Sequence, residues 1–353
     1  MSADKKKIRI AFFDTKPYDR EWFGKLGGAY RIDYLEAKLG PETAQLARGC
    51  DVVCAFVNDD LGKDTLRLLE AEGVQLIAMR CAGYNNVDIR AAYGKLHIVR
   101  VPAYSPYAVA EHAAALLLTL NRHLHKAYNR TRDFNYSLAG LTGMDLHGKT
   151  AGVIGTGRIG QVFIDICRGF GMRVLAYDAY PKAGAGYEYV DLDTLLRESD
   201  VVSLHCPLTE QTKHLLNKEN LARMKDTAIV INTSRGALID SRALLHALQK
   251  KKLGGAGLDV YEEEAEWFYE DHSERGVQDE TLELLSVLPN VLITSHQAFL
   301  TREALENIAA VTLENIRAYF AGEALPNEIC YQCSEFAHGG RSACAKTSTG
   351  RCF

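Results

Sequence analysis

The chain has 353 residues, with 41 basic and 45 acidic side chains and a formal net charge of −4. At roughly 150 residues per domain, this length predicts about two domains. The hydrophobic fraction of 47% is typical of a globular protein. The nearly balanced charge argues against a protein that binds nucleic acid or an anionic membrane through its overall charge.

No segment is expected to direct the chain into or across a membrane. The basic amino-terminal stretch has an apolar run that is interrupted by Arg9 and ends at Asp14, which is too short for a signal peptide. The longest other apolar run, Ala113 to Leu120, is shorter than the ~18 residues that span a bilayer. Five of the nine cysteines lie in the body of the chain and read as buried thiols. A cytoplasmic protein is predicted.

Nine short apolar or β-branched runs are candidate strands, and helix-length segments separate most of them. They begin at Ile8, Val52, Gln75, His97, Thr150, Arg173, Val201, Ala228 and Asn290. Most show no alternation of apolar and polar residues, which is typical of strands covered on both faces. The pattern predicts βαβ units and parallel sheets.

Two long helices are predicted. The first has Ser105 as its N-cap and Pro106 as its first residue, and its pattern continues to Arg132. Such a helix spans about 40 Å and has the length to link two lobes, although an ordinary core helix explains its apolar half equally well. The second is expected from Thr301 to about Tyr319.

A glycine motif, Gly155-x-Gly157-x-x-Gly160, follows an apolar strand and opens an amphipathic helix. The next strand ends in Asp178, eighteen residues after Gly160. In a dinucleotide-binding turn the three glycines permit the turn, the approach of the pyrophosphate and close helix packing. The helix N-terminus attracts phosphate, and the carboxylate accepts hydrogen bonds from ribose hydroxyls but repels a 2′-phosphate. The motif predicts NAD rather than NADP, with a purely structural glycine turn as the alternative.

Polar residues follow three later strands and include Arg235, Glu264 and His296. Ligands of open parallel sheets bind at the carboxyl ends of the strands. Arginine pairs bidentately with a carboxylate, histidine exchanges a proton near neutral pH, and a carboxylate beside histidine favours the imidazolium. Each residue alone also reads as an ordinary loop residue. Together they form a complete set for reducing a 2-keto acid.

These residues resemble the motifs of the D-isomer-specific 2-hydroxyacid dehydrogenase family, and within it the fermentative bacterial D-lactate dehydrogenase branch. The resemblance runs from about Ile8 to Ile329. Its segments include RCAGYNNVD from Arg80, VPAYSPYAVAEHA from Val101, TAGVIGTGRIG from Thr150, HCPLT from His205, NTSRGALID from Asn232, GLDVYEEE from Gly257 and SHQAFLTREAL from Ser295.

The resemblance implies an α/β fold with two doubly wound parallel-sheet domains. A Rossmann NAD-binding domain of residues 104–298 would be inserted into a flavodoxin-like catalytic domain of residues 1–103 and 299–329. Residues 330–353 would form a Cys-rich C-terminal tail. The family pattern also implies a homo-oligomer, either a tetramer or a dimer.

Individual roles follow from the same resemblance. His296 is expected to be the acid/base, Glu264 its carboxylate partner and Arg235 the group that binds the keto acid. The substrate would also contact the backbone of Ala82 and Gly83 and the pocket-wall residues Tyr104 and Phe299. Beside the three glycines, the positions matching NAD contacts are Arg158, Ile159, Asp178, Cys206, Pro207, Thr212, Thr233 and Asp259.

The implied activity is reversible hydride transfer between NADH and pyruvate, giving D-lactate. Another D-2-hydroxyacid dehydrogenase, acting on a bulkier 2-keto acid, is one alternative. An NAD(H)-sensing, corepressor-like binding protein is an alternative from a different class, because such relatives can keep the arginine, glutamate and histidine. Partners other than the small substrate, the cofactor and copies of the chain are not expected.

The tail departs from the family pattern because it carries Cys330, Cys333, Cys344 and Cys352 within its residues. Four thiols can bind zinc tetrahedrally, but only one CxxC pair is present and the outer spacing is irregular. The segment is rich in Gly, Ser and Thr and poor in apolar residues, which favours a mobile or extended tail. No metal is predicted.

Overall fold

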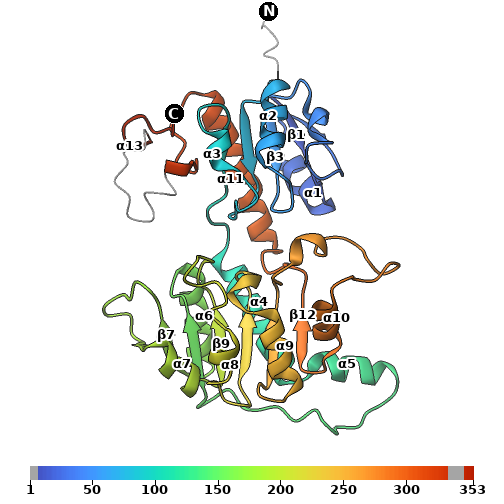
Figure 1. The fold of residues 1–353 in the computed structure, drawn as a ribbon, viewed down its shortest axis with the longest axis vertical. Coiled ribbons are helices and arrows are strands. Elements are labelled where there is room, and N and C mark those ends of the chain that lie inside the picture. The colour runs from blue at the N-terminus through green and yellow to red at the C-terminus, as the bar shows by residue number, and fades with distance from the viewer. Residues whose placement is uncertain (1–6, 333–345) are drawn as a thin grey trace, which may run out of the picture. The chain divides into compact units, whose positions relative to one another are not determined.

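The computed structural model describes residues 7–332 and 346–353. Contacts divide the chain into two compact units (Figure 1). The first unit combines Met1–Ser105 with Thr301–Phe353, and the second is Pro106–Leu300. Each unit contains one parallel sheet with helices, so the α/β class with two parallel-sheet domains is confirmed.

The first unit has a five-stranded sheet in the order β2-β1-β3-β4-β5, with every pair parallel. This is the strand order of flavodoxin-like folds. The strands are β1 (Arg9–Phe12), β2 (Arg31–Tyr34), β3 (Val52–Ala55), β4 (Leu76–Met79) and β5 (His97–Val99). The helices are α1 (Pro17–Leu26), α2 (Lys63–Ala71), α3 (Ile89–Ala92), α11 (Arg302–Phe320) and α13 (Lys346–Thr349). Figure 1 shows how the red carboxy-terminal helix α11 joins the blue amino-terminal elements in this unit.

The second unit has a seven-stranded parallel sheet in the order β12-β11-β10-β9-β6-β7-β8. Counted from β6, this is the Rossmann order with one strand added. The strands are β6 (Thr150–Ile154), β7 (Arg173–Tyr177), β8 (Glu188–Tyr189), β9 (Val201–Leu204), β10 (Ile229–Asn232), β11 (Gly255–Leu258) and β12 (Val291–Ile293). The helices are α4 (Pro106–Asn121), α5 (Leu124–Arg132), α6 (Arg158–Gly169), α7 (Leu192–Glu198), α8 (Lys218–Leu221), α9 (Ser241–Gln249) and α10 (Glu280–Val287).

All nine predicted runs contain a strand, but the apolar runs do not reveal β2, β8 or β11. β2 and β8 are edge strands with polar residues and little burial. β11 is fully buried yet glycine-rich. A Cβ on Gly257 would lie 2.8 Å from Ile231 Cδ1 and 3.1 Å from Leu116 Cβ, so glycine lets α4 pack closely on this strand.

The predicted single helix from Pro106 to Arg132 is wrong, because the structure breaks it into α4 and α5. His123 lies between them with a left-handed φ of 50°. The buried Asn121 fixes the end of α4, since its amide donates to Met144 O at 2.8 Å and accepts from Met144 N at 3.0 Å. The other long helix is confirmed as α11, which Thr301 caps at Ala304 N.

A buried cation organises the base of the loop that follows β4. Arg80 is 3% exposed and donates to Asp14 O at 2.8 Å, with Asp19 Oδ1 at 3.4 Å. Its guanidinium lies 4.5 and 4.8 Å from the ring centres of Phe12 and Phe56. Pairing with carboxylate and aromatic faces offsets the cost of burying the charge.

The described end of the tail folds back on the first unit. Leu325 N donates to Gly350 O at 2.8 Å, and Cys352 N donates to a Glu328 carboxylate oxygen at 2.6 Å. The expectation of a mobile or extended tail is therefore wrong for residues 346–353. Cys333 and Cys344 lie outside the described residues.

Two predictions about burial and membranes have a structural outcome. The five body cysteines are all buried, as expected, namely Cys50, Cys54, Cys81, Cys167 and Cys206. Within residues 7–332 and 346–353, no helix combines the length and the apolar character that crossing a membrane requires.

Candidate active site

The predicted catalytic residues lie beyond the carboxyl ends of three neighbouring strands in the second unit. Arg235 follows β10, Glu264 follows β11 and His296 follows β12, and these strands are adjacent in the sheet. Parallel strands end at a common edge, so the topology directs the three loops to one side of the unit.

His296 and Glu264 form a close pair. His296 Nδ1 lies 2.7 Å from Glu264 Oε1, and each side chain is 20% exposed. The other carboxylate oxygen accepts a 2.8 Å hydrogen bond from Tyr261 N, which holds Glu264 in this orientation. A carboxylate on Nδ1 fixes the ring and places the proton there in the neutral form. Nε2 is therefore the ring atom that remains for proton exchange.

Asp259 holds the loop that carries His296. The His296 backbone has a left-handed φ of 50° and donates to Asp259 O at 2.7 Å. The fully buried Asp259 carboxylate accepts from Gln297 N at 2.9 Å, Ala298 N at 2.8 Å and Thr294 Oγ1 at 2.5 Å. Several hydrogen bonds on one buried carboxylate stabilise an otherwise costly backbone conformation. Asp259, predicted as an NAD contact, thus also positions the catalytic histidine.

His112 belongs to the same network and was missed from the sequence. This residue of α4 places Nε2 at 3.2 Å from Asp259 Oδ1 and 3.0 Å from Thr294 Oγ1. Its signal is a histidine in the otherwise apolar stretch AVAEHAAALLL. The periodicity of a helix does not reveal which distant loop such a side chain meets.

The Arg235 loop packs directly against the segment that carries Glu264. A Cβ on Gly236 would clash with the backbone of Tyr261 and Glu262, so only glycine permits this approach. Arg235 is half-buried, and its Nη1 donates to Ser234 O at 2.7 Å. The structure therefore brings the Arg235 and Glu264 loops into contact.

The glycine motif has the geometry of a dinucleotide-binding turn. Gly155 has a φ of 93°, and a Cβ there would lie 2.5 Å from Cys206 N. A Cβ on Gly160 would clash with the carbonyl oxygen of Gly155, so the start of α6 packs tightly on the turn. Gly157 caps α6 and has open space where its Cβ would be. This space at the helix N-terminus suits a pyrophosphate.

Asp178 lies at the end of β7 and is tied to the same turn. One carboxylate oxygen accepts from Thr156 N at 2.6 Å and Thr156 Oγ1 at 2.9 Å, and the other accepts from Tyr180 N at 2.9 Å. Burial favours the neutral acid, but these hydrogen bonds outweigh it and hold the pKa of Asp178 below its ordinary value. The carboxylate stays charged at neutral pH, as discrimination against a 2′-phosphate requires.

The other predicted cofactor residues border the same edge of the sheet. Arg158 and Ile159 form the first turn of α6, and Cys206 and Pro207 follow β9. Thr212 Oγ1 donates to Pro207 O at 2.7 Å. Thr233 follows β10, and its buried hydroxyl has no hydrogen-bond partner among the described residues. An orphaned hydroxyl beside an open glycine turn fits a bound dinucleotide.

The substrate residues predicted for the first unit lie on the loop after β4 and before α4. Ala82 O accepts a 2.7 Å hydrogen bond from Arg100 Nη1, and the Arg100 guanidinium lies 5.0 Å from the Tyr84 ring centre. Arg100 was missed because nothing in its spacing marks it as a support of this loop. Tyr104 O accepts from Asn307 Nδ2 at 2.6 Å. Phe299 is buried in the second unit.

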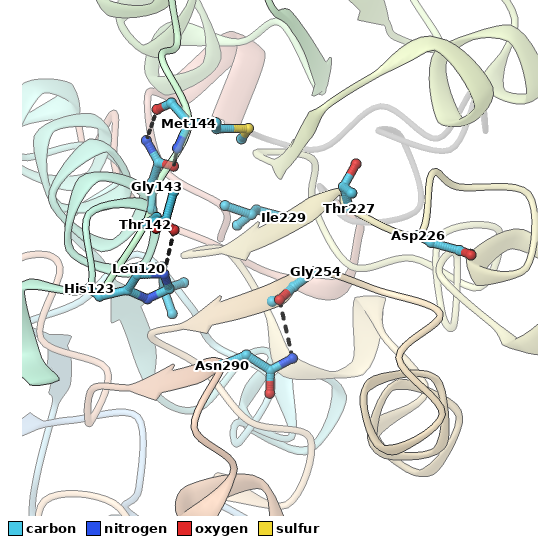
Figure 2. A pocket seen from close by; sticks show the side chains of 12 residues that line it. Leu120, His123, Thr142, Gly143, Met144, Asp226, Thr227, Ile229, Gly254 and Asn290 are labelled. Atoms are coloured by element: carbon cyan, nitrogen blue, oxygen red, sulfur yellow. Dashed lines mark hydrogen bonds between the residues drawn. The ribbon is translucent and has the colours of Figure 1, made fainter. Parts of the chain in front are cut away.

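A separate cavity of about 370 Å³ lies at the opposite edge of the second sheet. Figure 2 shows it between the end of α4 and the amino ends of β10 and β11. Its lining includes His123, Asp226, Thr227, Gly254 and Asn290, and none of the predicted site residues. Within the part of the chain that the structure describes, no cluster of His, Cys, Asp and Glu could hold a metal ion.

Comparisons with known proteins agree with this geometry. Residues 114–298 match the family described as D-isomer specific 2-hydroxyacid dehydrogenase, NAD binding domain. D-lactate dehydrogenase from Escherichia coli is 51% identical over 91% of this chain and 100% of its own length. The chain belongs to the D-isomer-specific 2-hydroxyacid dehydrogenase family. It is therefore an NAD-dependent dehydrogenase, as the glycine motif and Asp178 predicted.

Solved structures of this dehydrogenase family are similar along the whole fold. The pyruvate reductase of Chlamydomonas reinhardtii is 44% identical, with a TM-score of 0.87 over 91% of this chain and 98% of that one. Salmonella D-lactate dehydrogenase is 52% identical, with a TM-score of 0.82 over 91% of this chain and 100% of that one. The Rossmann domain and the α/β organisation are thereby confirmed.

We expect two glycine substitutions to separate folding from cofactor binding. Gly160→Ala places a methyl group on a backbone oxygen and should destabilise the second unit by about 1–3 kcal/mol. Gly157→Ala has space and a φ of −66°, so the melting temperature should stay unchanged while the Kd for NADH rises roughly tenfold or more. Thermal melts and NADH fluorescence titrations measure both effects. Wild-type NADH affinity in Gly157→Ala would contradict the pyrophosphate assignment.

Proposed function

We propose that this dehydrogenase reduces pyruvate to D-lactate with NADH, and catalyses the reverse reaction. The observation that carries the proposal is the His296–Glu264 pair at 2.7 Å, beside a glycine-permitted contact with the Arg235 loop. A proton donor and a fixed cation on one edge suit a substrate with a carbonyl beside a carboxylate. The D-lactate dehydrogenases among its relatives support pyruvate as the keto acid.

Each residue has a defined task in this proposal. His296 Nε2 donates the proton that converts the carbonyl oxygen of pyruvate to the hydroxyl of lactate. Glu264 stabilises the imidazolium through Nδ1 and keeps the ring oriented. Arg235 pairs with the substrate and stabilises the negative charge that develops on the carbonyl oxygen. NADH, when bound, supplies the hydride that reaches the carbonyl carbon.

The cofactor and substrate residues keep their predicted roles as part of the proposal. The open N-terminus of α6, with Gly157, Arg158 and Ile159, would hold the pyrophosphate, and Asp178 the adenosine ribose. The orphaned Thr233 hydroxyl supports a contact with the nucleotide from β10. Contacts of Ala82, Gly83, Tyr104 and Phe299 with the keto acid, and a cytoplasmic location, stay predictions.

Two substitutions test the assignment of roles. His296→Gln should lower kcat roughly 10²- to 10⁴-fold while NADH binding is kept, because only the proton donor is lost. Arg235→Lys should chiefly raise the KM for pyruvate, roughly tenfold or more, because a lysine cannot pair bidentately. The exposed His246→Gln and Arg242→Lys are matched controls on α9. Near-normal pyruvate turnover by His296→Gln would remove His296 as the acid/base.

A chiral assay of the product tests the function itself. The wild-type enzyme with NADH and pyruvate should form D-lactate, and kcat/KM should be higher for pyruvate than for a branched or aromatic 2-keto acid. Each methylene in a fitted pocket is worth about 1–3 kcal/mol, so the ratio is measurable. Preference for the bulkier acid would favour the first alternative. Binding of NADH without turnover would favour a corepressor-like sensor.

An exposed apolar surface on the second unit supports the predicted homo-oligomer. Leu124, Tyr128, Phe134, Tyr136 and Leu138 are between 53% and 82% exposed. Apolar patches of this kind on one segment mark interfaces, and we infer that a second copy of the chain covers this one. Phe134→Asp with Leu138→Asp should lower the sedimentation coefficient to that of a smaller assembly. Tyr180→Asp, equally exposed elsewhere, is the control; an unchanged coefficient in the double variant would exclude this surface.

A further inference from the structure

Two cysteines of the tail pack together although 22 positions separate them. Cys330 is 2% exposed and Cys352 is fully buried, and the two form a small cluster with Tyr93 packed against it. The D-lactate dehydrogenase from Escherichia coli aligns over its whole length with 91% of this chain, so part of this chain has no counterpart there. Neither cysteine belongs to the catalytic machinery described above.

The segment before Cys330 is bound to the edge of the first sheet. β5 is the edge strand, and residues 327–329 lie along it as an antiparallel bridge. Arg100 N donates to Asn327 O at 3.1 Å, and Ile329 N donates to Ile98 O at 2.9 Å. These bonds cover an otherwise open edge and fix the position of Cys330.

The segment around Cys352 is held from both sides. Cys352 N donates to Glu328 Oε2 at 2.6 Å, and Glu328 Oε1 lies 2.5 Å from His97 Nδ1. The next residue, Phe353, stacks on the His97 ring with 4.2 Å between centres and an interplanar angle of 16°. A buried carboxylate that serves both β5 and the tail therefore places Cys352 next to Cys330.

Basic side chains fasten the same part of the tail. Arg351 donates to Tyr319 O at 2.8 Å and to Glu323 O at 3.0 Å, at the carboxyl end of α11. Lys346 Nζ donates to Glu328 O at 2.7 Å. Cations are favourable at the carboxyl end of a helix, where carbonyl groups lack intrahelical partners. These contacts bring the cysteines together without any covalent bond.

We propose that Cys330 and Cys352 are a redox modification site that a small disulfide oxidant, such as glutathione disulfide, converts to an intramolecular disulfide. The thiolate of one cysteine attacks the oxidant and releases one thiolate, which leaves a mixed disulfide. The second cysteine then displaces the other half of the oxidant as a thiolate. The two cysteine thiols lose two electrons and two protons, and the oxidant gains them as two thiols.

Access of the oxidant follows from how the tail is attached. α13 has four residues, and surface hydrogen bonds supply much of the attachment of residues 346–353. Such segments open at low free-energy cost, far below that of global unfolding. Opening exposes the thiols, and closing returns Cys352 to Cys330. The site follows the thiol–disulfide balance of its surroundings and does not depend on which keto acid the enzyme reduces.

The disulfide closes a covalent loop from residue 330 to residue 352 and clamps the tail on β5. Closing a loop of this length stabilises the folded state by restricting the unfolded chain. β5 leads directly to Arg100, whose side chain supports Ala82. The clamp therefore acts on the strand beside the predicted substrate loop, and its direct effect is on the stability of the first unit.

Peptide mapping of the full-length protein tests the linkage. The protein is equilibrated with glutathione disulfide or with reduced glutathione, its remaining thiols are alkylated, and it is digested with trypsin and chymotrypsin. Cleavage after Tyr331 separates Cys330 from Cys333, and cleavage after Arg351 releases the dipeptide of Cys352 and Phe353. The oxidised sample should contain Cys330 joined to this dipeptide. Linkage through Cys333 or Cys344 alone, or four alkylated tail cysteines, would overturn the proposal.

Melting temperatures of matched variants test the consequence. Oxidation should raise the melting temperature of wild type and of Cys344→Ser by roughly 5 °C, and that of Cys352→Ser not at all. An equal shift in Cys352→Ser, or none in wild type, contradicts the clamp. If Cys352→Ser does not fold, the peptide map of the wild-type protein still decides the linkage.

Discussion

The catalytic arrangement depends on one buried carboxylate, that of Asp259. It ends the glycine-rich strand β11 and accepts hydrogen bonds from Thr294, Gln297 and Ala298, while its carbonyl oxygen binds His296 N. A left-handed histidine is otherwise disfavoured, and these bonds make it the stable conformation. The position of the imidazole, and with it the pairing to Glu264, follows from a group that carries no proton itself.

Glycine supplies the second constraint, because the loops at this edge approach one another more closely than side chains permit. At Gly155 and Gly160 it joins strand, turn and helix, and at Gly236 it lets the Arg235 loop touch the segment of Glu264. The same property on Gly257 brings α4, and therefore His112, close to the sheet. Cofactor turn, substrate cation and acid/base thus share one principle of close backbone packing.

Local pattern predicted the strands and motifs well where the residues are apolar or closely spaced. β6 and β10 are continuous apolar runs, and the glycine motif lies within six residues. β11 escaped because burial of a glycine strand leaves no hydrophobic signal, and β2 because an edge strand tolerates polar residues. The break at His123 escaped because the helical pattern continues across it, and the turn depends on Asn121 binding Met144.

The sequence by itself determined the family, the NAD preference and the identities of Arg235, Glu264 and His296, because these depend on residue type and short-range spacing. Only the tertiary structure decided that Asp259 and His112 hold the catalytic loop, that Arg100 supports Ala82, and that Cys330 meets Cys352. The physical reason is the same in each case. Such contacts join residues far apart in the chain, and packing between elements, rather than local propensity, sets them.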